Sequence, residues 1–177
     1  IGVKNIITSD VKQIESADKL ILPGVGSFDA GIENLNRSSL ADVIKEQARN
    51  KKKPILGICL GMQLLGRKSE EGKSEGLSLI PFNNVRFQFD NDSELKIPHM
   101  GWDVVDFKMN HPLADGLKGQ QRYYFVHSYY AVCDSQENIL ITCDYGYEFA
   151  AAVVKDNIMG VQFHPEKSHD FGMALLV

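Results

Sequence analysis

The chain has 177 residues, of which 44% are hydrophobic and 24% are charged, and its formal net charge is −4 at pH 7. These values are ordinary for a globular domain and exclude a disordered chain, a collagen-like repeat and a small disulfide scaffold. A mildly acidic chain also lacks the basic surface that nonspecific nucleic-acid binding requires, so we expect no nucleic-acid partner.

The length predicts a single domain over residues 1–177. The longest stretch without a charged residue covers residues 54–66 and is too short to cross a bilayer, so we expect no membrane partner. No signal peptide precedes Ile1, and the odd number of cysteines without metal-ligand spacing indicates reduced thiols in the cytoplasm. The chain begins without a methionine and stops inside an apolar pattern, so we expect it to be truncated at both ends.

Short apolar runs alternate with helical patterns in the first half of the chain. Residues 5–8 and 19–22 predict strands, the second stopped by Pro23 and Gly24. A helix is predicted after residue 39, because apolar residues recur there at helical spacing: Leu40, Val43, Ile44 and Ala48. Residues 54–58 are apolar almost throughout, which is typical of a strand buried on both faces of a parallel sheet.

The second half of the chain is richer in strands. They are predicted at residues 84–89, 123–127, 129–133, 139–143, 150–155 and 158–163, and the polar stretches 67–76 and 89–94 are predicted loops. Strand–helix alternation followed by strands predicts an α/β fold, a doubly wound, mostly parallel sheet with antiparallel additions. In that architecture, functional sites lie at the carboxyl ends of the strands.

The sharpest local feature is Cys59, which follows the apolar strand and stands between Gly57 and Gly61. This pattern is typical of a nucleophile elbow, with sulfur in place of the serine oxygen. The positive end of the following helix favours the reactive thiolate, and the backbone N–H of Leu60 is placed to hold an oxyanion. The alternative is a buried cysteine packed between two glycines. Cys133 and Cys143 lie in strand patterns and are predicted core residues.

His164 is the predicted base for this nucleophile, because a predicted strand leads directly into it. Pro165 favours an extended backbone at His164, and in an extended chain Glu166 projects from the same side. A carboxylate beside an imidazole selects its tautomer and stabilises the imidazolium. The rival base is His127, which has no carboxylate two residues on. We expect no catalytic role for the others, which are His99, His111 and His169, and no metal site.

A glycine loop at residues 22–28 supplies a candidate second oxyanion donor, the backbone N–H of Val25. The alternative is an ordinary turn between a strand and a helix.

Two motifs together resemble those of the class I (triad) glutamine amidotransferases: Gly-Ile-Cys-Leu-Gly-Met-Gln (57–63) and Phe-His-Pro-Glu (163–166). Within that class, the chain most resembles the glutaminase subunit of imidazole glycerol phosphate synthase. Four further motifs carry this resemblance: Leu-Pro-Gly-Val-Gly-Ser-Phe (22–28), Pro-His-Met-Gly-Trp (98–102), Tyr-Phe-Val-His-Ser-Tyr (124–129) and His-Pro-Glu-Lys-Ser (164–168). The resemblance implies a flavodoxin-like sheet and no cofactor.

The resemblance also implies roles for individual residues. Cys59 attacks the side-chain amide of L-glutamine, the N–H groups of Val25 and Leu60 hold the oxyanion, and His164 moves the protons. The implied glutamine-binding residues are Gly26, Gln63, Glu71, Ser128 and Tyr129, although a solvated acid is the alternative for Glu71. The implied partner is a cyclase subunit of the (β/α)8-barrel type, which receives ammonia through a tunnel. The implied interface residues are Trp102, Tyr124 and Lys167.

Three alternatives stay open at this point. The same glutaminase chemistry serves bacterial surface-polysaccharide synthesis in relatives of this subunit, and residues 167–173 look somewhat like that branch. A catalytically silent regulatory subunit and a stand-alone cysteine hydrolase are the other two. The chain also lacks the Asp-Tyr-Gly-x-Gly-Asn stretch with which the family usually opens.

Overall fold

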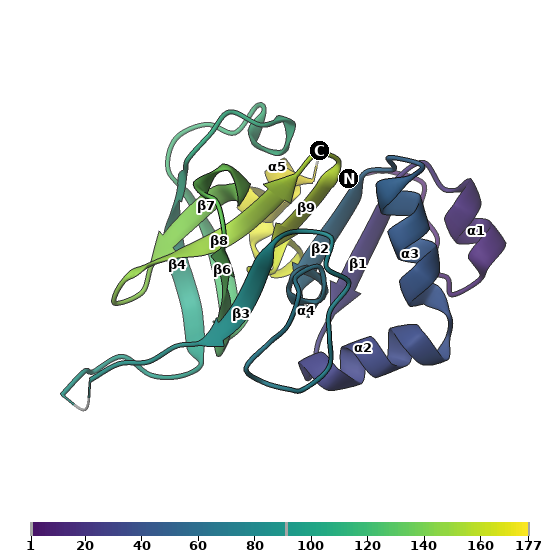
Figure 1. Ribbon diagram of the computed structural model, residues 1–177. Coiled ribbons are helices and arrows are strands. Elements are labelled where there is room, and N and C mark those ends of the chain that lie inside the picture. The colour runs from purple at the N-terminus through teal and green to yellow at the C-terminus, as the bar shows by residue number, and fades with distance from the viewer. Residues whose placement is uncertain (1, 91, 177) are drawn as a thin grey trace.

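A computed structural model describes residues 2–90 and 92–176 of the chain (Figure 1). The strands are β1 (Leu20–Gly24), β2 (Ile55–Cys59), β3 (Phe82–Arg86), β4 (His99–Phe107), β5 (Gln121–His127), β6 (Tyr129–Cys133), β7 (Ile139–Asp144), β8 (Glu148–Lys155) and β9 (Ile158–Val161). The helices are α1 (Val11–Ser16), α2 (Phe28–Arg37), α3 (Leu40–Arg49), α4 (Leu60–Leu64) and α5 (His169–Leu175), with 3-10 turns η1 (Pro112–Ala114), η2 (Gln136–Asn138) and η3 (Pro165–Lys167).

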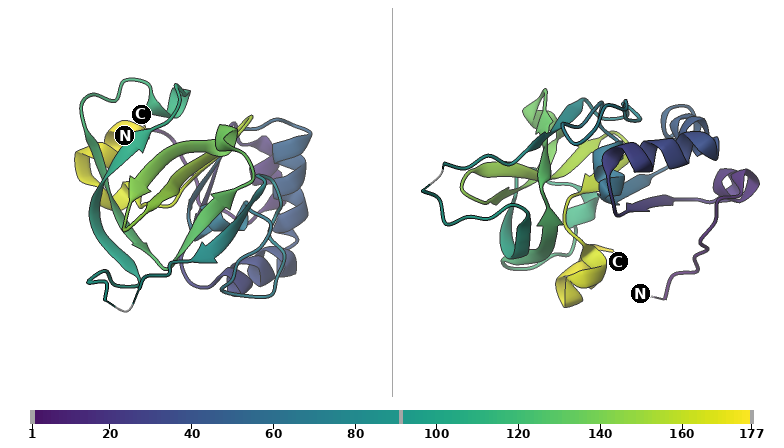
Figure 2. Two further views of the ribbon diagram at one scale, coloured as in Figure 1. Left: turned by 60° about the vertical axis from the view of Figure 1, so that its left-hand side comes forward. Right: turned by 90° about the horizontal axis from the view of Figure 1, so that it is seen from below.

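The strands form one mixed sheet in the order β1-β2-β9-β8-β7-β4-β5, and β6 joins β8 to β3. Among pairs of the strands named above, only β1–β2 and β2–β9 are parallel, and one isolated parallel bridge joins Ser69 to Asn84. The α/β class is confirmed, but the parallel part of the sheet is smaller than predicted. Parallel neighbours need a long crossover, whereas residues 145–147 alone link β7 to β8, and Asp156 and Asn157 link β8 to β9. The antiparallel part curls strongly (Figure 2).

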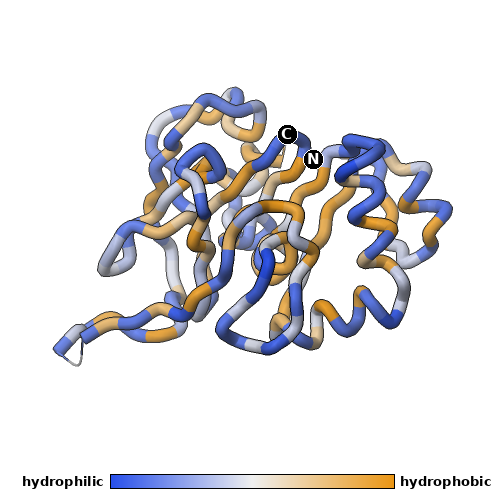
Figure 3. The backbone as a smooth tube through the Cα atoms, viewed as in Figure 1, coloured by the Kyte–Doolittle hydropathy of each residue, from blue (hydrophilic) through white to orange (hydrophobic). Residues whose placement is uncertain are grey.

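Hydrophobic residues are buried on both faces of this sheet. One cluster lies under α2, α3 and α4 and includes Phe28, Ile55 and Phe82. The other lies inside the curl and includes Leu56 and Phe163. The neighbouring residues Ile55 and Leu56 of β2 therefore pack into different clusters on the two faces. The apolar run of this strand predicted burial on both faces. Figure 3 shows the same strands as an apolar centre between polar loops.

The predicted strand at residues 5–8 is wrong, because this segment pairs with no other strand and exposes Ile6 and Ile7. A strand needs a neighbour for its backbone groups, and here Thr8 Oγ1 instead accepts a local hydrogen bond from the Asp10 N–H. The strand predicted at 84–89 begins at Phe82 and ends at Arg86, and helix α2 and strand β4 were not predicted. None of the described helices has both the length and the apolar character of a membrane span.

Candidate active site

Cys59 ends β2 in a backbone conformation that few residues adopt, with φ +53° and ψ −114°. The chain can turn this sharply because glycines flank the cysteine on both sides. A Cβ atom at Gly61 would overlap the carbonyl oxygen of Leu22, and one at Gly57 would lie 2.7 Å from the backbone nitrogen of Met62. The predicted elbow is therefore present: β1 packs too closely against Gly61, and α4 too closely against Gly57, for any side chain at these two positions.

The thiol of Cys59 is buried, and Gln162 Nε2 lies 3.8 Å from its Sγ. Burial is the largest effect on this group and raises the pKa of Cys59 to about 11, and the charge of Glu166 adds to the rise. The Leu60 N–H lowers the pKa but does not outweigh burial. The start of the helix thus acts in the expected direction, but burial outweighs it, and the thiol needs a base.

The alkylation rate of Cys59 in the isolated chain is expected to keep rising as the pH increases from 7 through 10. Only the thiolate reacts with iodoacetamide, and the thiolate fraction grows until the pH reaches the pKa of about 11. Peptide-resolved mass spectrometry at each pH measures the rate for each cysteine separately. A rate that levels off below pH 8 would show instead that the resting nucleophile is a thiolate.

His164 and Glu166 form the predicted contact, with 2.6 Å between His164 Nδ1 and Glu166 Oε1. His164 is extended, as Pro165 predicted, and its side chain is only 3% exposed. The residues that follow form the turn η3 instead of an extended chain, so the turn brings the carboxylate back to the ring. The carboxylate accepts from Nδ1–H, which leaves the Nε2 lone pair of a neutral ring free to accept a proton.

Ser168 fixes the backbone of His164, and we did not predict this role. Its hydroxyl donates to the His164 carbonyl oxygen at 2.6 Å and accepts from the Tyr124 N–H at 3.0 Å. The His164 N–H in turn donates to the Tyr124 carbonyl oxygen at 2.9 Å. These bonds join the segment after β9 to β5. The motif at 164–168 contained this serine, but spacing alone does not reveal its partner on a distant strand.

Cys59 and His164 lie at the same edge of the sheet, because β2 and β9 are parallel neighbours with Ile58 opposite Val161. In the described part of the chain, no hydrogen bond joins Cys59 Sγ to the His164 ring. Catalytic hydrogen bonds are often long in the absence of substrate, so the shared edge is the relevant observation.

The glycine loop lies beside the elbow, because Gly24 at the end of β1 pairs in register with Cys59. Val25 is largely exposed, and Gly26 has φ +103°, which favours glycine. Glu71 is exposed, but its carboxylate is held in place: Oε2 accepts from the Phe28 N–H at 2.7 Å, at the start of α2. Asp29 accepts hydrogen bonds from backbone N–H groups of residues 73 and 74, so two carboxylates tie the polar loop 67–76 to this helix.

The other residues predicted to bind glutamine form a second group on the opposite side of Cys59. The buried Gln63 Nε2 donates to the Tyr129 carbonyl oxygen at 3.3 Å and to Gln162 Oε1 at 3.0 Å. The Ser128 carbonyl oxygen accepts from the Phe87 N–H at 3.0 Å. Gln162 thus joins Gln63 to the thiol, a link that we did not predict from the sequence.

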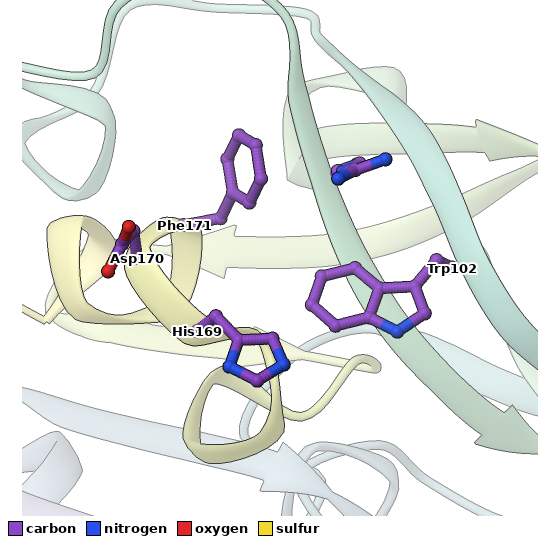
Figure 4. Close-up of a pocket in the computed structure, with 5 residues that line it drawn as sticks. Trp102, His169, Asp170 and Phe171 are labelled. Carbon is purple, nitrogen blue, oxygen red and sulfur yellow. The ribbon is translucent and has the colours of Figure 1, made fainter.

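The three predicted interface residues lie together beside η3. Trp102 of β4 is opposite Tyr124 of β5, and Lys167 Nζ lies 5.9 Å from the centre of the Tyr124 ring. Trp102 is 38% exposed and stacks on His169, with 5.5 Å between ring centres. Figure 4 shows the rings of Trp102 and His169 lining a pocket with Asp170 and Phe171. Arg122 also lines this pocket. Cys59 does not line this pocket.

Two other predictions concern residues outside this site. Cys143 is buried as predicted, while Cys133 is half-buried at the end of β6. The ring of His99, for which no catalytic role was predicted, contacts Asp103 and His127. Among residues 2–90 and 92–176, no group of three His, Cys, Asp or Glu residues is arranged to hold a metal ion.

Comparison with known proteins places this geometry in a family. The model of the family described as glutamine amidotransferase class-I matches residues 3–176. A crystal structure of a glutamine amidotransferase shares the fold, with a TM-score of 0.73 at 16% identity over 99% of this chain and 88% of that chain. The chain belongs to the class I glutamine amidotransferases.

Two curated relatives specify the family further, and both are named imidazole glycerol phosphate synthase subunit HisH 2. The protein from Pseudomonas aeruginosa is 51% identical and the one from Methanococcus maripaludis is 53% identical, each over 99% of this chain and 86% of the relative. Within its class, the chain is a member of the HisH family, which confirms the resemblance found in the motifs.

Proposed function

We propose that the chain is the glutaminase subunit of an imidazole glycerol phosphate synthase, a single cytoplasmic domain that hydrolyses L-glutamine to glutamate and ammonia. The observation that carries the proposal is the elbow at Cys59 beside the His164–Glu166 pair, in a chain about half identical to HisH subunits. The names of these relatives favour histidine biosynthesis over surface-polysaccharide synthesis.

The first step is attack by Cys59 Sγ on the side-chain amide carbon of glutamine. The thiol is protonated at neutral pH, so His164 Nε2 takes its proton as the carbon–sulfur bond forms. Glu166 stabilises the imidazolium through Nδ1–H. The backbone N–H groups of Leu60 and Val25 hold the negative oxygen, because these residues directly follow the paired strand ends Cys59 and Gly24.

The second half of the reaction releases ammonia and then glutamate. His164 returns its proton to the departing nitrogen, which leaves as ammonia while a γ-glutamyl thioester remains on Cys59. Water, activated by His164, attacks the thioester and regenerates the thiol. Gly26 and Glu71 hold glutamine from the side of α2, while Gln63 and the backbone of Ser128 and Tyr129 hold it from the side of β6, with no cofactor.

The proposed partner is a (β/α)8-barrel cyclase subunit, which forms a heterodimer with this chain and uses the ammonia to make imidazole glycerol phosphate and aminoimidazole carboxamide ribotide. Free ammonia is protonated in neutral water and stops being a nucleophile, so direct transfer protects it. Trp102, Tyr124 and Lys167 form the docking surface, because they are gathered beside η3. A half-exposed tryptophan is a typical interface anchor.

Glutamate release by the purified chain, with and without a histidine-pathway cyclase and its ribotide ligand, tests the proposal. Strong stimulation by the liganded cyclase is the expected result. Activity that ignores the cyclase would favour the polysaccharide branch or a stand-alone hydrolase, and a silent chain that still binds the cyclase would indicate a regulatory subunit.

A further inference from the structure

A chain of polar groups crosses the aromatic core between the outer surface of β4 and the start of β6. Asp103 Oδ2 lies 2.7 Å from His99 Nε2, and His99 Nδ1 lies 3.0 Å from His127 Nε2. His127 Nδ1 lies 2.7 Å from the carbonyl oxygen of Tyr129. Both rings are buried, while the Asp103 side chain is 38% exposed. We call these three side chains the histidine chain.

The three contacts of the histidine chain fix the number of hydrogens that its two rings carry. Each of its three contacts needs one hydrogen, and both of its ends, a carbonyl oxygen and a carboxylate, accept but do not donate. Two neutral imidazoles carry only one ring N–H each. With an ionised Asp103, all three contacts are hydrogen bonds only when the two rings together carry a third N–H, so the pair of rings holds a positive charge.

The carboxylate of Asp103 is the group that can hold this charge in the core. Burial lowers the pKa of both rings, that of His127 to about 3, and the contact with Asp103 opposes this effect at His99 without reversing it. Because His99 is the ring that contacts this carboxylate, the geometry places the extra proton on His99 and not on His127. Among the described residues, three other titratable groups face the histidine chain. Tyr145 stacks on His99, and the other two are Cys143 and His164.

The far end of the histidine chain meets the candidate active site. The Tyr129 carbonyl oxygen that accepts from His127 also accepts from Gln63, which bonds Gln162, whose amide reaches Cys59 Sγ. We propose that Asp103, His99 and His127 are positioning residues that share one extra proton and thereby fix the Tyr129 carbonyl in the glutamine-binding segment. The effect on activity rests on the proposed function, whereas the proton count does not.

Nitrogen-15 NMR of the full chain with labelled histidine tests the proton count directly. Signals of His99 and His127 are assigned by their loss in His99→Asn and His127→Asn. At pH 7 we expect three of the four ring nitrogens of these residues to have the shift of a protonated nitrogen. Two protonated nitrogens would overturn the proposal. In Asp103→Asn the expected number is two, because the carboxamide donates its own hydrogen to His99 Nε2.

A matched pair of variants at Asp103 tests positioning. Asparagine can keep all three hydrogen bonds between neutral groups, whereas Asp103→Leu removes one partner of His99. We expect Asp103→Leu to raise the KM for glutamine about tenfold, more than its kcat changes, and Asp103→Asn to raise KM much less. Equal KM values for the two variants would overturn the positioning role. If neither the original chain nor the two variants release glutamate with any partner, the proposed function fails. The NMR experiment still shows whether the two rings share an extra proton.

Discussion

Cys59→Ala is expected to reduce glutamate release by the cyclase complex by roughly 10⁴-fold or more, since it removes the group that forms the covalent intermediate. Binding to the cyclase is expected to stay unchanged, because Cys59 is buried at the elbow and the predicted docking residues lie beside η3. Glutamate release and binding of the complex by calorimetry are measured on the same preparation.

Cys143→Ala is the matched control, because it removes an equally buried thiol from β7, outside the candidate site. Its turnover is expected to stay close to that of the original chain. Glutamate release by Cys59→Ala at a rate near that of this control would remove Cys59 from the mechanism.

Gly61→Ala is expected to lower the free energy of unfolding by about 3 kcal/mol or more, because the added methyl group overlaps the backbone of β1 and neither segment can move independently. Urea titration followed by circular dichroism measures the loss.

The matched control is Gly31→Ala in helix α2, where the new Cβ would meet only the flexible ends of the Leu64 and Leu60 side chains, at 3.1 and 3.4 Å. Its free energy of unfolding is expected to change by no more than about 1 kcal/mol, because alanine also favours the helix. Equal losses in the two variants would contradict the claim that the elbow specifically requires glycine.

The elbow and the His164–Glu166 pair were predictable because short segments determine them. Strand, glycine, nucleophile and glycine specify a turn locally, and a proline fixes the backbone of the residue before it. The buried character of β2 was predictable for the same reason, since an apolar run needs cover on both faces.

Contacts between distant segments were not predictable in this way. Whether a strand pairs in parallel depends on the sheet around it, so the extent of the antiparallel part was underestimated. His99 and Asp103 are four residues apart on β4, but their connection to His127 requires the register of β4 against β5. The prediction of a strand at residues 5–8 was wrong for the opposite reason. Its local pattern suits a strand, but no described segment pairs with it.

Tyr124 belongs to two systems at once. Its ring lies on the surface with Trp102 and Lys167, while its N–H and carbonyl oxygen bond the hydroxyl of Ser168 and the backbone of His164. A displacement of the Tyr124 backbone therefore reaches the histidine through a single hydrogen bond, without passing through the core. The outer face and the base are therefore expected to move together, and the hydrogen bonds of Ser168 to both segments limit any movement of one relative to the other.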